Sequence, residues 1–242
     1  MSSDGKQNAV SRPGQASAEV EAFLRKAAAV PAVAGKRGRL VFALDATMSR
    51  QPTWDLALSL QGRMFDTAAA LGGLDVQLVY FRGMAECRAS SFIANGAGLA
   101  ALMGKISVRG GQTQIARVLE HVRTETRRAP VGAFVYVGDA MEENVDSLCG
   151  LAGELGLLGV KAFMFHEGAD PMAASAFREI ARLTGGAYAA FDQSSAQRLA
   201  SLLAAAAAYA AGGSRALEAM ALTPKGDEAR LLLTQMRQGR GS

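Results

Sequence analysis

Short apolar segments alternate along the chain with segments of helical periodicity. Six segments have the length of strands in a sheet: 40–44, 76–81, 84–92, 133–137, 160–165 and 187–191. The segment at 84–92 carries Glu86 and Arg88, so we expect it at an edge. Strands that alternate with helices are typical of parallel sheets with crossover connections. The pattern predicts a Rossmann-like, doubly wound, mostly parallel six-stranded sheet with one antiparallel edge strand and helices on both faces.

The predicted helices lie between these strands. In the first, Leu56, Leu60, Met64 and Ala68 recur at helical spacing between Pro52 and the glycines at 72–73. Further helices are expected at 97–105, 115–122, 145–155, 177–184 and 199–211.

The two ends of the chain depart from this central α/β pattern at 40–211. Residues 1–39 form a polar tail that leads into a short helix capped by Ser17. Residues 212–242 begin with a glycine pair, which we interpret as a hinge into a tail. A short amphipathic helix is expected at 229–236, either as a docking arm or as a free terminus.

Composition favours a globular protein in the cytoplasm. Of its 242 residues, 50% are hydrophobic and 20% are charged, which excludes wholesale disorder. The longest apolar stretch, at 199–211, is mostly alanine and too short for a bilayer, so no membrane is expected. The N-terminal residues lack the apolar segment of a secretory signal. Cys87 and Cys149 lack CxxC spacing and are expected to be free thiols.

The net charge of +4 comes from the ends of the chain. Residues 40–211 contain 14 Lys and Arg against 16 Asp and Glu, so the central part is slightly acidic. The densest basic cluster is Lys36-Arg37-Gly38-Arg39, and we interpret it as a solvated linker. A few cationic residues without aromatic neighbours are a poor nucleic-acid footprint. Nucleic acid is therefore not expected as a partner.

Oxygen-bearing side chains follow two of the predicted strands. Asp45, Thr47 and Ser49 alternate directly after the first strand, and Asp139 follows the strand at 133–137. Thr113 precedes a helix between them. Ligands of parallel sheets collect at the carboxyl ends of the strands, so these five side chains are expected on one edge. An all-oxygen set suits Mg²⁺, with Mn²⁺ or Ca²⁺ as alternatives, although Asp and Thr also commonly cap loops and helices.

This order of motifs resembles the von Willebrand factor A (VWA) domain and its metal-ion-dependent adhesion site (MIDAS). The family pattern is Asp-x-Ser-x-Ser, then Thr, then Asp, and the resemblance covers about 40–211. Thr47 replaces the first serine of that pattern but keeps the hydroxyl. A second departure is Gly138-Asp139-Ala140, where the family often has Thr-Asp-Gly. The resemblance implies that Thr47, Ser49 and Thr113 approach the metal through hydroxyls, while Asp45 and Asp139 supply charge directly or through waters.

The resemblance implies a binding module rather than an enzyme. A partner protein would offer an Asp or Glu to the metal, and intracellular bacterial members of the family often serve as adaptors for AAA+ ATPases or assembly complexes. Two alternatives remain: a metal-dependent phosphoryl-transfer enzyme that uses Asp45, and an RNA-associated module. A haloacid dehalogenase phosphatase needs a second Asp where this chain has Thr47. A P-loop and a Gly-x-Ser-x-Gly elbow are both absent from the sequence.

Other polar residues near these motifs have simpler roles. His121 and His166 are interpreted as surface or partly buried histidines rather than catalytic bases. Glu142 and Glu143 are expected in the first turn of the next helix, on a solvated face. Trp54 fits either the rim of the metal loop, with Met48 and Arg50, or the packing of its helix. The two glycines at 110–111 are expected to allow the ligand loop more than one backbone path.

Overall fold

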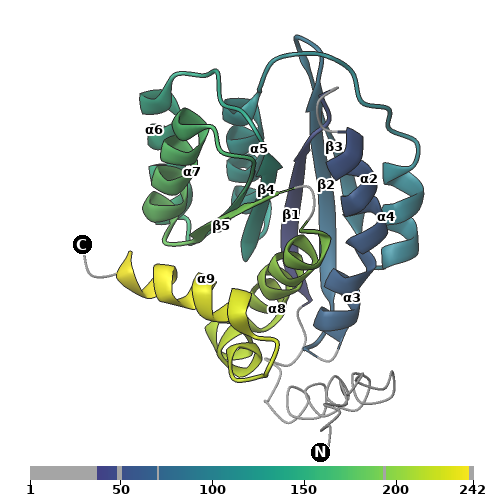
Figure 1. The fold of residues 1–242 in the computed structure, drawn as a ribbon, viewed down its shortest axis with the longest axis vertical. Coiled ribbons are helices and arrows are strands. Elements are labelled where there is room, and N and C mark those ends of the chain that lie inside the picture. Colours follow the sequence, from purple (N-terminus) through teal and green to yellow (C-terminus); the bar gives the residue numbers. More distant parts are fainter. Residues whose placement is uncertain (1–36, 48–50, 70, 193–194, 240–242) are drawn as a thin grey trace, which may run out of the picture.

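A six-stranded sheet forms the centre of the protein (Figure 1). The computed structural model describes residues 37–47, 51–69, 71–192 and 195–239. The strands are β1 (Gly38–Asp45), β2 (Leu74–Arg82), β3 (Glu86–Ile93), β4 (Ala133–Gly138), β5 (Lys161–Glu167) and β6 (Ala187–Phe191). Their spatial order is β3-β2-β1-β4-β5-β6, and all neighbours are parallel except β2 and β3. The predicted doubly wound sheet with an antiparallel edge strand is confirmed.

Helices cover both faces of this sheet. They are α2 (Gln51–Leu60), α3 (Gly62–Ala69), α4 (Gly96–Met103), α5 (Ile115–Arg128), α6 (Val145–Leu157), α7 (Pro171–Thr184), α8 (Ala196–Ala221) and α9 (Asp227–Gln238). Leu40, Phe42 and Leu44 pack with α2, α3, α4, α8 and α9 on one face. Val41 and Ala43 pack with α5, α6 and α7 on the other. This burial on both faces explains why β1 is a continuous apolar run.

The single helix expected between Pro52 and the glycines at 72–73 is divided into α2 and α3. The break lies at Gln61, directly before Gly62. Glycine loses more backbone entropy in a helix than other residues do, which favours an interruption here. The helix expected from Ser17 lies outside the described residues.

The C-terminal residues pack on the sheet. The glycine pair interrupts α8 with a kink, where Gly213 has φ 67° and ψ −160°, and the chain returns as α9. Leu232 and Met236 of α9 are buried in the same core as the sheet. The Gln235 amide accepts a hydrogen bond from the Tyr188 N–H at 2.9 Å and donates one to the Tyr188 carbonyl at 2.8 Å. The helix thus satisfies backbone groups on β6, which would otherwise be a free edge.

The arginines before and within β1 fold against the domain. Arg37 forms an ion pair with Asp75 at 2.6 Å, and Arg39 lies 3.9 Å above the ring of Phe92. Arg39 also pairs with Glu125 at 3.4 Å. The prediction of a solvated linker is wrong for Arg39, because β1 already begins at Gly38 and places this side chain beside β3 and α5. Arg37 stays exposed, but it is paired with Asp75 of β2.

None of the described helices has both the length and the apolar character needed to cross a membrane.

Candidate metal centre

Asp45 and Asp139 lie at the carboxyl ends of two adjacent strands. Leu44 of β1 pairs with Val137 of β4, so Asp45 follows one partner of this pair and Asp139 lies two residues beyond the other. Neighbouring strands are about 4.8 Å apart, which brings the two residues to one edge. Asp45 is 2% exposed. A carboxylate this deeply buried is costly unless a cation or several donors face it.

The loop after β1 bends back onto Asp45. The Thr47 N–H donates a hydrogen bond to Asp45 Oδ1 at 2.8 Å, which forms a local turn of the kind that Asp favours. Thr47 itself is buried. Ser49, together with Met48 and Arg50, lies outside the described residues. The structure therefore places Thr47 beside Asp45 and leaves Ser49 as a prediction.

Thr113 is tied to the loop that carries Asp139. The Thr113 N–H donates to Glu142 Oε2, and the Glu142 N–H donates to Thr113 Oγ1, each at 3.1 Å. This reciprocal pair joins residues that are 29 positions apart in sequence. Together with the register of β1 and β4, it brings Asp45, Thr47, Thr113 and Asp139 to the same edge of the sheet.

Glu142 and Glu143 have a different role from the one predicted. They precede α6, whose N-cap is Asn144. Glu142 is exposed, as predicted, but it bonds to Thr113, whereas Glu143 is half-buried and turns toward α5. The Glu143 carboxylate accepts hydrogen bonds from the N–H groups of Ile115 and Ala116, the latter at 2.9 Å. These donors belong to the first turn of α5, where a helix has unpaired N–H groups and a positive dipole end. The preference of acidic side chains for helix N-termini predicts such a contact for Glu143, but from the sequence alone it predicts the N-terminus of α6, not that of α5.

Glu143 is expected to stabilise the start of α5. Replacing Glu143 by alanine removes the acceptor of two backbone N–H groups and should lower the free energy of unfolding by about 1–2 kcal/mol. Urea denaturation would measure this loss. Glu120 is exposed on the same helix, so Glu120→Ala is the matched control and should change stability by less than about 0.5 kcal/mol. Equal effects of the two changes would contradict this role.

The long connection between α4 and α5 runs past the site and is held at two points. The Arg109 N–H donates to the Ala46 carbonyl at 3.0 Å, and the Gln112 N–H donates to the Gly83 carbonyl at 3.3 Å. A Cβ atom on Gly111 would overlap backbone atoms of Gly83, whereas one on Gly110 would meet nothing within 4 Å. The two glycines therefore differ: Gly111 permits a close approach of two backbones, and only Gly110 has open space around it.

Two further buried polar residues lie near the same edge. Glu167, at the end of β5, is 5% exposed and accepts a hydrogen bond from the Thr53 hydroxyl, which anchors the start of α2. His166 is fully buried, with Nδ1 3.0 Å from the Tyr188 hydroxyl, and burial lowers its pKa. Sequence reasoning did not single out Glu167 because its partner is 114 residues away.

Trp54 and His121 have structural roles. Trp54 is 2% exposed and packs edge-on against Tyr80, with ring centroids 6.3 Å apart, so it is a core residue instead of part of the rim. His121 Nε2 lies 2.9 Å from Gln77 Oε1, and burial lowers the pKa of this histidine. Cys87 and Cys149 are free thiols, as predicted.

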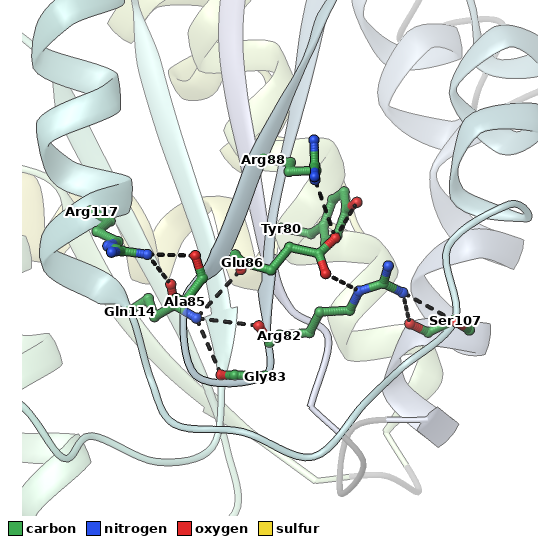
Figure 2. A network of polar contacts seen from close by, with 9 residues as sticks. All are labelled: Tyr80, Arg82, Gly83, Ala85, Glu86, Arg88, Ser107, Gln114 and Arg117. Atoms are coloured by element: carbon green, nitrogen blue, oxygen red, sulfur yellow. Dashed lines mark hydrogen bonds and ion pairs between the residues drawn. The ribbon is translucent and has the colours of Figure 1, made fainter.

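Beside the metal edge, the turn between β2 and β3 carries a network of arginines (Figure 2). Glu86 is its centre: Arg82 Nε lies 3.0 Å from one carboxylate oxygen, and Arg88 Nε lies 3.3 Å from the other. The Tyr80 hydroxyl donates to Glu86 at 3.2 Å. The hydrogen bond from Arg82 lowers the pKa of the Glu86 carboxyl, and burial raises the pKa of Tyr80.

Arg117 of α5 and Gln114, the residue just before this helix, hold the other side of this turn (Figure 2). Arg117 donates to the Ala85 carbonyl at 2.7 Å and to the Gln114 side chain at 2.9 Å. The Gln114 amide in turn lies 3.4 Å from the carbonyls of Arg82, Gly83 and Glu86. The turn is thus fixed to the helix that follows Thr113.

Chemically, the candidate centre is an oxygen site. Among the described residues, no three His, Cys, Asp or Glu side chains come together as a metal-holding group. Any ion here would depend on two carboxylates, on hydroxyls and on water, a donor set that suits a hard cation.

Comparison with known proteins identifies the fold. The sequence matches no family profile and no curated protein. The SpRpn10 VWA domain superposes with a TM-score of 0.55 at 11% identity, covering 68% of this chain and 95% of that domain. Proximal thread matrix protein 1 of the mussel byssus, with a zinc-occupied MIDAS motif, gives 0.56 at 17% identity and covers 69% of this chain and 45% of that one. The pilus adhesin SpaC from Lactobacillus rhamnosus GG gives 0.52 at 10% identity, over 71% of this chain and 30% of SpaC. The chain thus has a VWA fold, and at these identities the likeness extends to the fold alone.

Proposed function

We propose that this chain is a protein-interaction module whose metal site holds an acidic residue of a partner protein. The observation that carries the proposal is the convergence of Asp45, Thr47, Thr113 and Asp139 on one sheet edge. Ser49 would complete the set. The neighbours of known structure support the interpretation, since one of them has a zinc-occupied MIDAS motif and another is an adhesin.

The residues present fit a divalent cation. Asp45 is an almost fully buried carboxylate, and its position on the protein is fixed by the Thr47 N–H. Thr113 is fixed in the same way by Glu142, which uses one acceptor site of its hydroxyl and leaves another for an ion. Two carboxylates balance the charge of Mg²⁺, Mn²⁺ or Ca²⁺ without filling its coordination shell.

Such an ion would supply an electrophilic position for an incoming carboxylate. Neutral hydroxyl ligands leave the cation short of anionic donors, so a partner's Asp or Glu would gain most by joining it. We propose that the partner is a cytoplasmic protein, in which case the chain could serve as an adaptor for an AAA+ ATPase or an assembly complex.

Capture of partners from a cell lysate tests the metal dependence. Immobilised protein should retain its partner in Mg²⁺ and lose it in EDTA, and an Asp139→Asn column should retain none. Asp66 is exposed on α3, so an Asp66→Asn column is the matched control and should behave like the native protein. Removal of one Asp or Glu from the captured partner should abolish binding. Equal capture in EDTA would contradict the proposal.

The enzyme alternative makes the opposite prediction. Turnover of a phosphate ester that disappears in Asp45→Asn would favour metal-dependent phosphoryl transfer over binding. Retention on an RNA column would favour the RNA-associated alternative.

A further inference from the structure

The turn between β2 and β3 forms a second, cationic surface beside the metal edge. One hollow of about 340 Å³ is lined by Arg82, Met84, Glu86 and Arg109 together with the glycines at 83 and 110 and Ala85. A second, of about 250 Å³, is lined by Arg88 and Arg117, with Cys87, His121 and two small apolar residues. The two linings hold four arginines and one glutamate, a formal charge of +3, in a region that is otherwise slightly acidic. We call these linings the hairpin surface.

Three of its four arginines, Arg88, Arg109 and Arg117, are exposed, whereas Arg82 is half-buried and bonded to Glu86 and Ser107. Arg82 and Arg88 share the single carboxylate of Glu86, so one positive charge is left over. Arg117 is held by a backbone carbonyl and an amide, which orient it without neutralising it. Arg109 is exposed and forms no side-chain ion pair within the described part of the chain. Arg82 and Arg117, which hydrogen bonds hold in place, lose little side-chain entropy when an anion binds.

The hairpin surface adjoins the candidate metal centre. Asp45 pairs with Phe81 in the sheet, so the turn that begins after Arg82 lies one strand away at the same edge. The Arg109 N–H is bonded to the carbonyl of Ala46, the residue next to Asp45. A chain segment that places one carboxylate at the metal would therefore reach these arginines within a few residues, since an extended chain spans about 3.3 Å per residue.

We propose that the hairpin surface binds an acidic segment of the same protein partner. The inference rests on the proposed function, to which it adds the chemistry of the partner: several acidic residues with an apolar residue among them. Met84 lines the same hollow as Arg82 and Arg109 and is 71% exposed. An exposed thioether suits apolar side chains of a protein and has no counterpart in the phosphate backbone of a nucleic acid. The exposed Met84 therefore favours a peptide as the occupant.

A charge-reversal variant tests the surface with a defined probe. The probe is a fluorescently labelled peptide of about ten residues, mostly glutamate with two leucines, whose binding is followed by fluorescence anisotropy. Arg88→Glu with Arg109→Glu should weaken its binding about tenfold, which corresponds to about 1.4 kcal/mol. Both side chains are exposed and away from the core, so the variant should fold. The matched control is Arg215→Glu with Lys225→Glu, an equal charge change on exposed residues of α8 and the loop before α9.

Further arms separate the occupants and the two proposals. Met84→Ser should weaken the leucine-containing peptide and leave an all-glutamate peptide unaffected. A peptide that fails to bind, an equal loss in both charge variants, or tighter binding of a single-stranded RNA of similar charge would overturn the inference. EDTA acts on the metal site alone. If EDTA does not change binding while the hairpin variant binds weakly, the metal proposal fails and the hairpin surface stands. If EDTA abolishes binding while the hairpin variant binds normally, the metal proposal stands and the hairpin surface fails.

Discussion

Replacing Asp45 by asparagine is expected to lower the affinity of the protein for Mg²⁺ by about 100-fold or more. Mg²⁺ loses its coordinated water reluctantly, and carboxylates are the protein groups that replace that water. Loss of one of the two carboxylates therefore removes much of the free energy of Mg²⁺ binding. Residues that only orient metal ligands already contribute about 10- to 100-fold to affinity, and a residue at the ion should contribute at least as much.

The asparagine variant separates metal binding from folding. The amide oxygen of Asn can still accept the Thr47 N–H, which donates to Asp45 Oδ1 at 2.8 Å, so the local turn should persist. Calorimetric titration with MgCl₂ would measure affinity, and circular dichroism would check the fold. Asp66→Asn serves again as the control, because it removes the same charge from an exposed position on α3. Native Mg²⁺ affinity in Asp45→Asn would rule out this metal site.

The strands could be predicted because each is a short-range pattern. Residues 40–44 are apolar without interruption, as burial on both faces requires, and the segment with Glu86 and Arg88 is indeed the antiparallel edge strand. The position of Asp45 and Asp139 followed from the same pattern, since parallel strands end at one edge.

Contacts between distant segments could not be predicted. Glu143 was assigned to the helix that follows it, but its carboxylate binds the start of a helix 27 residues earlier. Arg37 is interpreted as part of a solvated linker because its basic cluster lacks aromatic neighbours in sequence, yet Asp75, 38 residues away, forms an ion pair with it. In each case the residue type indicates the kind of interaction, but the residue that it contacts is set by the winding of the sheet, which brings distant segments together.

Gly111 is the clearest example of such a distant contact, and it leads to the second large prediction. Replacing Gly111 by alanine should lower the free energy of unfolding by about 1–3 kcal/mol, the usual cost of overpacking. The added Cβ would overlap the backbone of Gly83, which cannot move as a flexible side chain could. Relief of the overlap must separate the α4–α5 connection from the β2–β3 turn and break the Gln112 to Gly83 hydrogen bond.

The same change should weaken metal binding about tenfold, because Thr113 lies two residues beyond Gly111 and a displaced ligand loses most of its interaction. Gly110→Ala is the matched control, because it adds the same methyl group at the neighbouring position, where nothing lies within 4 Å of the new Cβ. It should leave stability within about 0.5 kcal/mol of native.

Urea unfolding and Mg²⁺ calorimetry on the two variants give four values. If both alanines behave alike, the contact with Gly83 does not constrain the loop. If only Gly111→Ala loses stability and metal affinity together, then the β2–β3 turn sets the position of Thr113, and the hairpin surface and the metal centre are parts of one rigid binding edge.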